Sequence, residues 1–120
     1  MGGILVKERK FTMAIYMAQF TYTSEAWSAM IEKPQDRTIP SKELVQKLGG
    51  KLLGLYYSLG VYDGIALFEV PDDVSATAVN LAVKAAGDMK VNEITRLFTM
   101  DEAMEAMRKA GSGQYSGPIR

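Results

Sequence analysis

The side chains best suited to chemistry in this 120-residue chain are a Tyr-Asp pair, two arginines and a group of aromatic residues. In the pair Tyr62-Asp63, the carboxylate could orient the neighbouring phenol as a proton donor in a pocket. A structural alternative, which we favour, has Asp63 capping a turn and Tyr62 packing as the anchor of a hairpin. We therefore assign no catalytic residue and keep both side chains as candidates for ligand binding.

Arg37 and Arg96 are candidates for anion recognition because a guanidinium group keeps its charge at any physiological pH. An arginine on an inward-facing strand needs a carboxylate partner or an anionic ligand. For Arg96 we favour an internal ion pair, with Glu69 or Asp63 as the partner. Arg37 follows Pro34 in a turn, where exposure to solvent is favoured over an anion-binding loop.

Aromatic residues of the first half of the chain could line one cleft between a sheet and its helices, offering apolar walls with hydroxyl tips. Core packing would explain the same residues without a ligand, and we favour it. These aromatic residues are Tyr16, Phe20, Tyr22, Trp27, Tyr56 and Tyr57. The full candidate ligand site is Tyr16, Tyr22, Trp27, Arg37, Tyr56, Tyr62, Asp63 and Arg96.

The composition excludes much of enzyme chemistry. The chain has no cysteine and no histidine, so it lacks disulfides, thiolate nucleophiles, the commonest metal ligand and the commonest neutral-pH base. Fourteen basic and fourteen acidic residues balance, which disfavours nucleic acid and anionic membranes as partners. The carboxylates have no metal-ligand spacing, and we expect no metal and no cofactor. No apolar run is long enough to span a membrane and no signal peptide is evident, so we expect a soluble, cytoplasmic protein.

Periodicity and turn residues predict the elements that must position these side chains. The expected strands are 14–23, 51–59, 65–70 and 91–99. The expected helices are a short one from Ser24 to the proline at 34, a second from Pro40 to Leu48, a third over 74–86 and a last one opened by Asp101-Glu102. Gly49-Gly50 should end the second helix, and the Asp63-Gly64 pair should supply positive φ in the hairpin turn.

This order predicts an α+β, ferredoxin-like βαββαβ fold, with a four-stranded antiparallel sheet and helices on one face. Alternate residues of the first strand are apolar on both faces, so the second face should be buried against another copy. We therefore expect a homo-oligomer, a dimeric α+β barrel or a larger ring. The predicted organisation is an N-terminal arm (1–12), one domain (13–110) with a short Met-rich C-terminal helix, and a flexible tail (111–120).

Several motifs in a fixed order resemble the GYD-domain family over about residues 13–98. They are Tyr22-Thr23, Pro34 and Arg37, Leu48-Gly49-Gly50, Leu59-Gly60 with Tyr62-Asp63, Pro71-Asp72-Asp73, and Arg96 with Phe98. The resemblance implies a ferredoxin-like fold that commonly assembles as a dimeric α+β barrel and whose activity is generally uncharacterised.

Three functions from different classes fit the sequence. The preferred one is a binding or regulatory module for a small molecule, which needs no catalytic group. The second is an accessory or structural subunit that docks on itself or on a larger enzyme complex. The third is a cofactor-independent isomerase or monooxygenase-like enzyme, which rests on analogy of fold alone.

Overall fold

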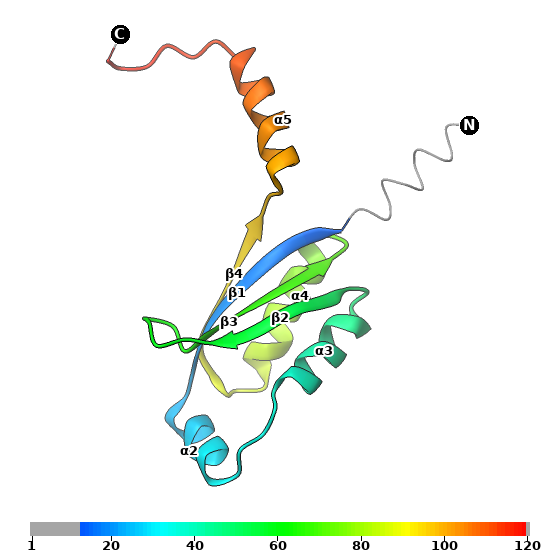
Figure 1. Cartoon of the computed structure of the whole chain (residues 1–120), viewed down its shortest axis with the longest axis vertical. Coiled ribbons are helices and arrows are strands. Elements are labelled where there is room, and N and C mark those ends of the chain that lie inside the picture. The colour runs from blue at the N-terminus through cyan, green and yellow to red at the C-terminus, as the bar shows by residue number, and fades with distance from the viewer. Residues whose placement is uncertain (1–12, 120) are drawn as a thin grey trace, which may run out of the picture.

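The computed structural model describes residues 13–119 of the chain, and the expected N-terminal arm lies outside them. Figure 1 shows the course of the chain through four strands and four helices in this part. In chain order they are β1 (Ala14–Tyr22), α2 (Ser24–Glu32), α3 (Thr38–Lys47), β2 (Lys51–Tyr57), β3 (Gly64–Val70), α4 (Asp73–Ala85), β4 (Met89–Leu97) and α5 (Met100–Gly111).

The strands form one antiparallel sheet in the order β2-β3-β1-β4. This order confirms the predicted α+β, ferredoxin-like fold. Phe20 pairs with Gly64 at one end of the sheet, and Ile15 pairs with Leu97 at the other. The β2–β3 loop and α5 therefore leave the sheet at opposite ends, as Figure 1 shows.

Local capping explains where the helices start. The Thr23 hydroxyl accepts the Ala26 N–H before α2, and the Asp72 carboxylate accepts the Ser75 N–H before α4. Helix α3 starts at Thr38, two residues earlier than predicted, because Pro40 falls within its first turn. A proline is tolerated there, since the first N–H groups of a helix have no intrahelical partner.

Helix α3 ends as its glycines predict. Gly49 has a φ of +85°, its N–H bonds the Gln46 carbonyl, and the Gly50 N–H bonds the Val45 carbonyl. These two bonds are the Schellman arrangement, which satisfies carbonyls that the helix end would leave free. The chain consequently reverses within two residues and enters β2.

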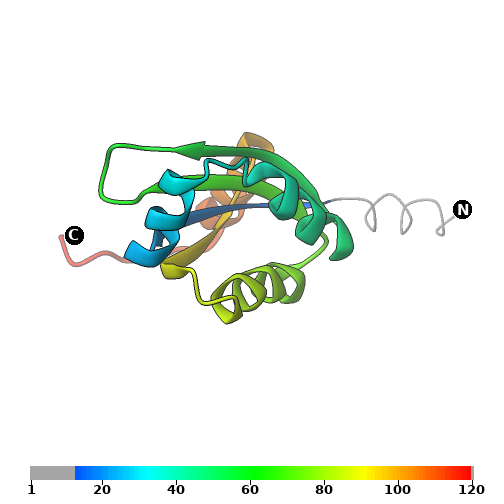
Figure 2. The same ribbon diagram turned by 90° about the horizontal axis from the view of Figure 1, so that it is seen from below.

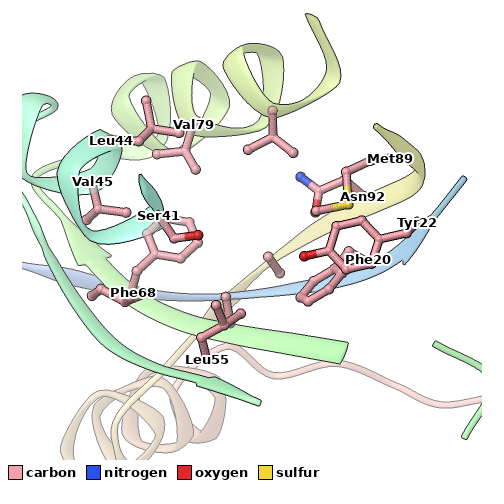
Figure 3. A pocket seen from close by; sticks show the side chains of 14 residues that line it. Phe20, Tyr22, Ser41, Leu44, Val45, Leu55, Phe68, Val79, Met89 and Asn92 are labelled. Atoms are coloured by element: carbon pink, nitrogen blue, oxygen red, sulfur yellow. The ribbon is translucent and has the colours of Figure 1, made fainter. Parts of the chain in front are cut away.

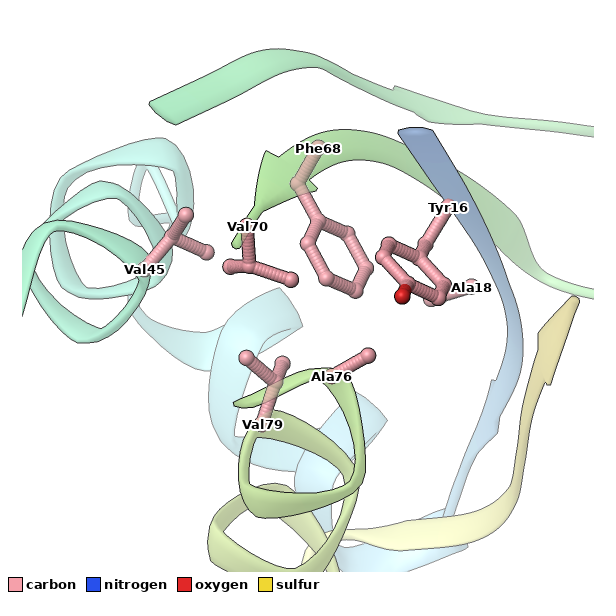
Figure 4. Close-up of a cluster of buried hydrophobic side chains, with 7 residues drawn as sticks. All are labelled: Tyr16, Ala18, Val45, Phe68, Val70, Ala76 and Val79. Atoms are coloured by element: carbon pink, nitrogen blue, oxygen red, sulfur yellow. The ribbon is translucent and has the colours of Figure 1, made fainter. Parts of the chain in front are cut away.

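The core lies between the sheet and one side of α3 and α4 (Figure 4). Alternate residues of β1 and β3 point toward these helices and are buried with side chains from both of them. The buried cluster is Tyr16, Ala18, Val45, Phe68, Val70, Ala76 and Val79. The rings of Tyr16 and Phe68 stack at 5.7 Å between centroids, which locks the two central strands together. In the view of Figure 2, α4 runs beneath the strands.

The other alternate residues of the sheet form what we call the open face, the side turned away from α3 and α4. Met17 of β1 pairs with Leu67 of β3, and Ile15 pairs with Leu97 of β4, so these side chains share that face. All four are only partly buried. The open face therefore carries an apolar patch, as the alternation in β1 predicted, and polar residues such as Gln19, Glu69 and Glu93 lie beside it on the same face.

The hairpin turn differs from its prediction in one respect. Neither Asp63 nor Gly64 has a positive φ, so the expected left-handed turn is wrong. Gly64 is instead required by close packing, because an added Cβ would lie 2.5 Å from Cζ of Phe20 and 2.6 Å from the Tyr56 carbonyl oxygen. A glycine signal in the sequence thus marked tight packing at the end of the sheet and not a tight turn.

Helix α5 projects away from the rest of the domain and buries none of its residues (Figure 1). Its N-cap is Thr99, which forms a capping box with Glu102. No helix within residues 13–119 has the length and apolar character needed to cross a membrane.

Candidate functional site

The carboxylate of Asp63 connects three elements at one end of the sheet. Its Oδ2 atom accepts the Tyr22 backbone N–H at 2.9 Å and the Trp27 indole N–H at 2.8 Å. The backbone N–H of Asp63 donates to the Phe20 carbonyl at 2.8 Å. Asp63 therefore fixes the β2–β3 loop to the end of β1 and holds α2 against both. This role is structural, but the carboxylate links three elements and does not cap its own turn, as we had favoured.

Aromatic side chains pack around this point. Tyr22 lies edge-on to Phe20 at 5.3 Å and to Trp27 at 5.2 Å, and Trp27 lies 5.6 Å from Tyr57. The hydroxyls of Tyr22 and Tyr57 are 3.2 Å apart and share a hydrogen bond. Burial, and then the bond to Tyr57, raise the pKa of Tyr22, while the charge of Arg37 works in the opposite direction. Tyr22 is consequently a neutral phenol that can donate a hydrogen bond.

An apolar cavity opens beside Tyr22, between α3, α4 and the sheet (Figure 3). Its volume is about 60 Å³. Leu44 and Val79 line it from the helices, and Phe68 and Leu55 line it from the sheet. Protein cores contain few voids larger than a water molecule. A cavity of this volume where α3, α4 and the sheet meet is therefore a candidate ligand site.

Three polar side chains interrupt the apolar wall: Tyr22, Ser41 and Asn92. The Ser41 hydroxyl donates to the Arg37 carbonyl at 2.8 Å, and the Asn92 side-chain amide donates to Asn80 Oδ1 at 3.0 Å. These bonds fix the orientation of the polar groups. The wall thus combines apolar surface with a few positioned polar atoms, which is the composition of small-molecule sites.

The cavity continues outward into a second space of about 210 Å³ that shares Tyr22, Ser41 and Leu44 with it. Arg37 and Asp88 border this outer part. Arg37 is a partly buried residue, and its guanidinium donates to the Gln35 side chain at 2.8 Å. One hydrogen bond occupies only part of its five-donor capacity, so Arg37 can also bind an anionic group at the mouth.

Arg96 lies near the opposite end of the sheet, away from this cavity. Its guanidinium is 3.5 Å from Asp73 Oδ1 and 3.8 Å from Glu102 Oε2. The predicted ion pair is therefore present, but its partners are neither Glu69 nor Asp63. The charge of Arg96 also lies over the ring of Phe98, 5.0 Å from the centroid.

Tyr16, like Arg96, contacts the carboxylate of Asp73. Its hydroxyl donates to Asp73 Oδ1 at 2.5 Å, and a groove of about 470 Å³ runs past both between α4 and β4. Burial, followed by the hydrogen bond and charge of Asp73, raises the pKa of Tyr16 to about 12. Both residues are thus accounted for by contacts within the chain.

This raised pKa predicts a loss of stability in alkali. Between pH 10 and 12 an unfolded Tyr16 releases its proton while the folded residue keeps it, so unfolding becomes easier as pH rises. In urea unfolding at pH 8 and pH 11, the wild type should therefore lose more stability than Tyr16→Phe, which has no proton to release. An equal loss in both proteins would contradict the assigned environment.

Tyr56 and Tyr62 lie outside the cavity as well. The Tyr62 hydroxyl donates to Glu93 Oε2 at 2.7 Å, and Glu93 pairs with Gln19 on the open face. The ring of Tyr56 covers Gly54, where an added Cβ would meet Tyr56 Cε2 at 2.7 Å. Both tyrosines therefore pack on the side of the sheet opposite α3 and α4.

The eight predicted site residues thus form three groups. Tyr22, Trp27, Arg37 and Asp63 come together beside the cavity, Tyr16 and Arg96 form the Asp73 group, and Tyr56 and Tyr62 pack elsewhere. Ser41, Leu44 and Asn92 also line the cavity and were not predicted. Their only sequence signal is the helical or strand periodicity that any core residue shows.

Comparison with known proteins agrees with the motifs in the sequence. The profile of the GYD-domain family, described as GYD domain, matches residues 16–107. No curated protein matches the chain. Among residues 13–119, no group of three or more His, Cys, Asp or Glu side chains is placed to hold a metal ion.

Proposed function

The chain belongs to the GYD-domain family, and on that premise we propose that it is a small-molecule binding module whose ligand occupies the cavity between α3, α4 and the sheet. The observation that carries the proposal is the apolar cavity with Tyr22, Ser41 and Asn92 in its wall and Arg37 at its mouth. Binding needs no catalytic group, which suits a chain without cysteine or histidine.

The chemistry of the wall indicates the ligand class. Apolar side chains dominate the inner space, whereas the outer space offers a guanidinium and hydroxyl groups. A ligand that satisfies both has a narrow apolar body and an anionic head, such as a carboxylate of moderate chain length. The carboxylate would pair with Arg37, and the apolar body would point toward Phe68.

Octanoate is a suitable probe, and Trp27 is a suitable reporter because it is the only tryptophan and packs on Tyr22. Octanoate titrated into the wild-type protein should change Trp27 fluorescence and release heat in calorimetry. Octanol, which has the same apolar body without the charge, should bind more weakly. Absence of octanoate binding at millimolar concentration would contradict the ligand class.

A pair of arginine variants locates the site. Arg37→Gln should weaken octanoate binding tenfold or more, because a charge-assisted hydrogen bond contributes about 1.5–3 kcal/mol. Arg96→Gln is the matched control, since it removes the same charge from a surface remote from the cavity, and it should bind as the wild type does. Equal affinity of the two variants would place the carboxylate elsewhere.

The open face favours a second role, that of a subunit which associates with itself. Partly exposed apolar side chains on a sheet are normally covered by another surface. We propose that the protein forms a homo-oligomer through this face, in the manner of a dimeric α+β barrel. Association with a larger enzyme complex and a cytoplasmic location remain predictions of the sequence.

A further inference from the structure

The apolar side of α5 has no partner within the described chain. Met100, Ala103, Met104 and Met107 follow one another at the i, i+3, i+4 and i+7 spacing, so they lie on one side of the helix. We call these residues the α5 stripe. All three methionines are exposed, and the rest of the helix carries acidic and basic residues together with Ala106 and Ala110. A helix with this pattern normally packs its apolar side against another surface.

Contacts at the first turn hold α5 in its outward direction. Only Phe98 and Thr99 separate β4 from α5. Glu102 bonds the backbone N–H of Thr99 at 2.8 Å and pairs with Arg96 of β4, whose guanidinium also covers Phe98. With so short and fixed a connection, α5 runs onward from β4 and does not fold back over its own sheet (Figure 1).

A second unpartnered apolar surface is the tip of the β2–β3 loop. The relative exposure of Leu59 is 107% and that of Val61 is 93%. The flanks of the tip are fixed, because the Ser58 N–H bonds the Asp63 carbonyl at 2.8 Å and the Ser58 hydroxyl bonds the Tyr62 carbonyl at 2.6 Å. The loop therefore presents two apolar side chains on a hydrogen-bonded frame, and Figure 2 shows it projecting beyond the strands.

These two surfaces lie at opposite ends of the same sheet, as the pairing of β1 with β3 and β4 requires. If two copies stack their open faces about a two-fold axis that runs across the strands, each end of one sheet meets the other end of its neighbour. The α5 stripe of each copy then lies at the same end of the stacked pair as the loop tip of the other. Such a contact is self-complementary, which two-fold symmetry demands.

The size of the surfaces supports the same arrangement. Two strands of seven residues and two of nine give the open face a flat footprint of roughly 500 Å². A stable dimer usually buries about 800 Å² on each partner, so the open face alone is small. A helix of twelve residues adds about 180 Å² of footprint on each copy, and the loop tip it contacts adds more.

We propose that α5 is a dimerisation arm: its methionine stripe packs on Leu59 and Val61 at the β2–β3 loop tip of a second copy of this chain, while the open faces stack between the arms. Methionine suits this contact because its flexible side chain fills irregular apolar gaps. The proposal is independent of the ligand cavity, which lies on the other side of the sheet.

Cross-linking between copies that carry a cysteine at different positions tests the contact. The chain has no cysteine of its own, so only the introduced thiols can react. Met107→Cys chains are mixed with Val61→Cys chains and treated with a short bismaleimide. A covalent heterodimer is expected. Leu81→Cys, an exposed position on α4, replaces Val61→Cys in the control and should give none. A Leu81 cross-link without a Val61 cross-link would overturn the proposal.

A mass measurement supplies the second readout. Met107→Glu places a charge on the α5 stripe and should weaken the dimer at least tenfold in light scattering or native mass spectrometry, with an unchanged circular dichroism spectrum. Ala106→Glu adds the same charge away from the stripe and should leave the dimer intact. A monomeric wild type, or equal effects of both variants, would contradict the proposal.

Discussion

Gly50→Ala is expected to destabilise the fold by about 3 kcal/mol, because a side chain at this position would overlap the backbone of the neighbouring strand. An added Cβ would lie 2.0 Å from the Glu69 carbonyl oxygen and 2.6 Å from Cγ1 of Val70. To relieve this overlap, β2 would have to move away from β3, although α3 and the core pack on these strands. The free energy of unfolding in urea measures this loss.

Alanine substitutions at two other glycines serve as controls for Gly50→Ala. Gly60→Ala, where nothing lies within 4 Å of an added Cβ, should change stability little. Gly49→Ala should cost about 1–2 kcal/mol, the penalty of a left-handed backbone, since its φ is +85° and its nearest neighbour is 3.6 Å away. A Gly50→Ala protein as stable as Gly60→Ala would show that β2 does not lie where the structure places it.

Asp63→Ala is the second substitution with a large expected effect, again about 3 kcal/mol. It would leave the Tyr22 backbone N–H and the Trp27 indole N–H without their common acceptor, and an unpaired, partly buried donor costs about 1–3 kcal/mol. The loss should appear in urea unfolding together with a red shift of Trp27 emission, since α2 would loosen and admit water.

Asp63→Asn separates the hydrogen bonds from the charge. Its amide oxygen can still accept both N–H groups, so the loss of stability should be much smaller than for alanine. If Asp63→Asn and Asp63→Ala destabilised the protein equally, the negative charge and not the pair of hydrogen bonds would hold α2 in place.

The sequence was sufficient to predict the order and type of the elements because their signals are local. Pro34, Gly49-Gly50 and Asp72 mark helix ends through their own conformational preferences, and alternation in β1 marks a sheet with two apolar faces. The same local logic failed at Gly64, where a glycine is required by a ring from β1 and a carbonyl from β2. Contacts of that kind depend on the assembled fold.

The site was only partly predictable for the same reason. Asp63 and Tyr22 are 41 positions apart, and Tyr16 and Asp73 are 57 apart, so nothing in their local sequence indicates which tyrosine meets which carboxylate. The aromatic residues were expected to line one cleft. The register of the sheet instead places Tyr16 near the end that leads to α5, and the pleat turns Tyr56 to the face opposite Tyr57.

A methyl-labelled NMR titration of the protein with octanoate tests the proposed ligand site most directly, because it shows where a ligand lies. Shifts should be confined to methyl groups around the cavity, above all those of Leu44, Val79 and Val83, while the signals of Leu67 on the open face and Leu59 on the loop stay unchanged. Shifts at Leu67 or Leu59 with an undisturbed Val79 would contradict a ligand site between α3, α4 and the sheet.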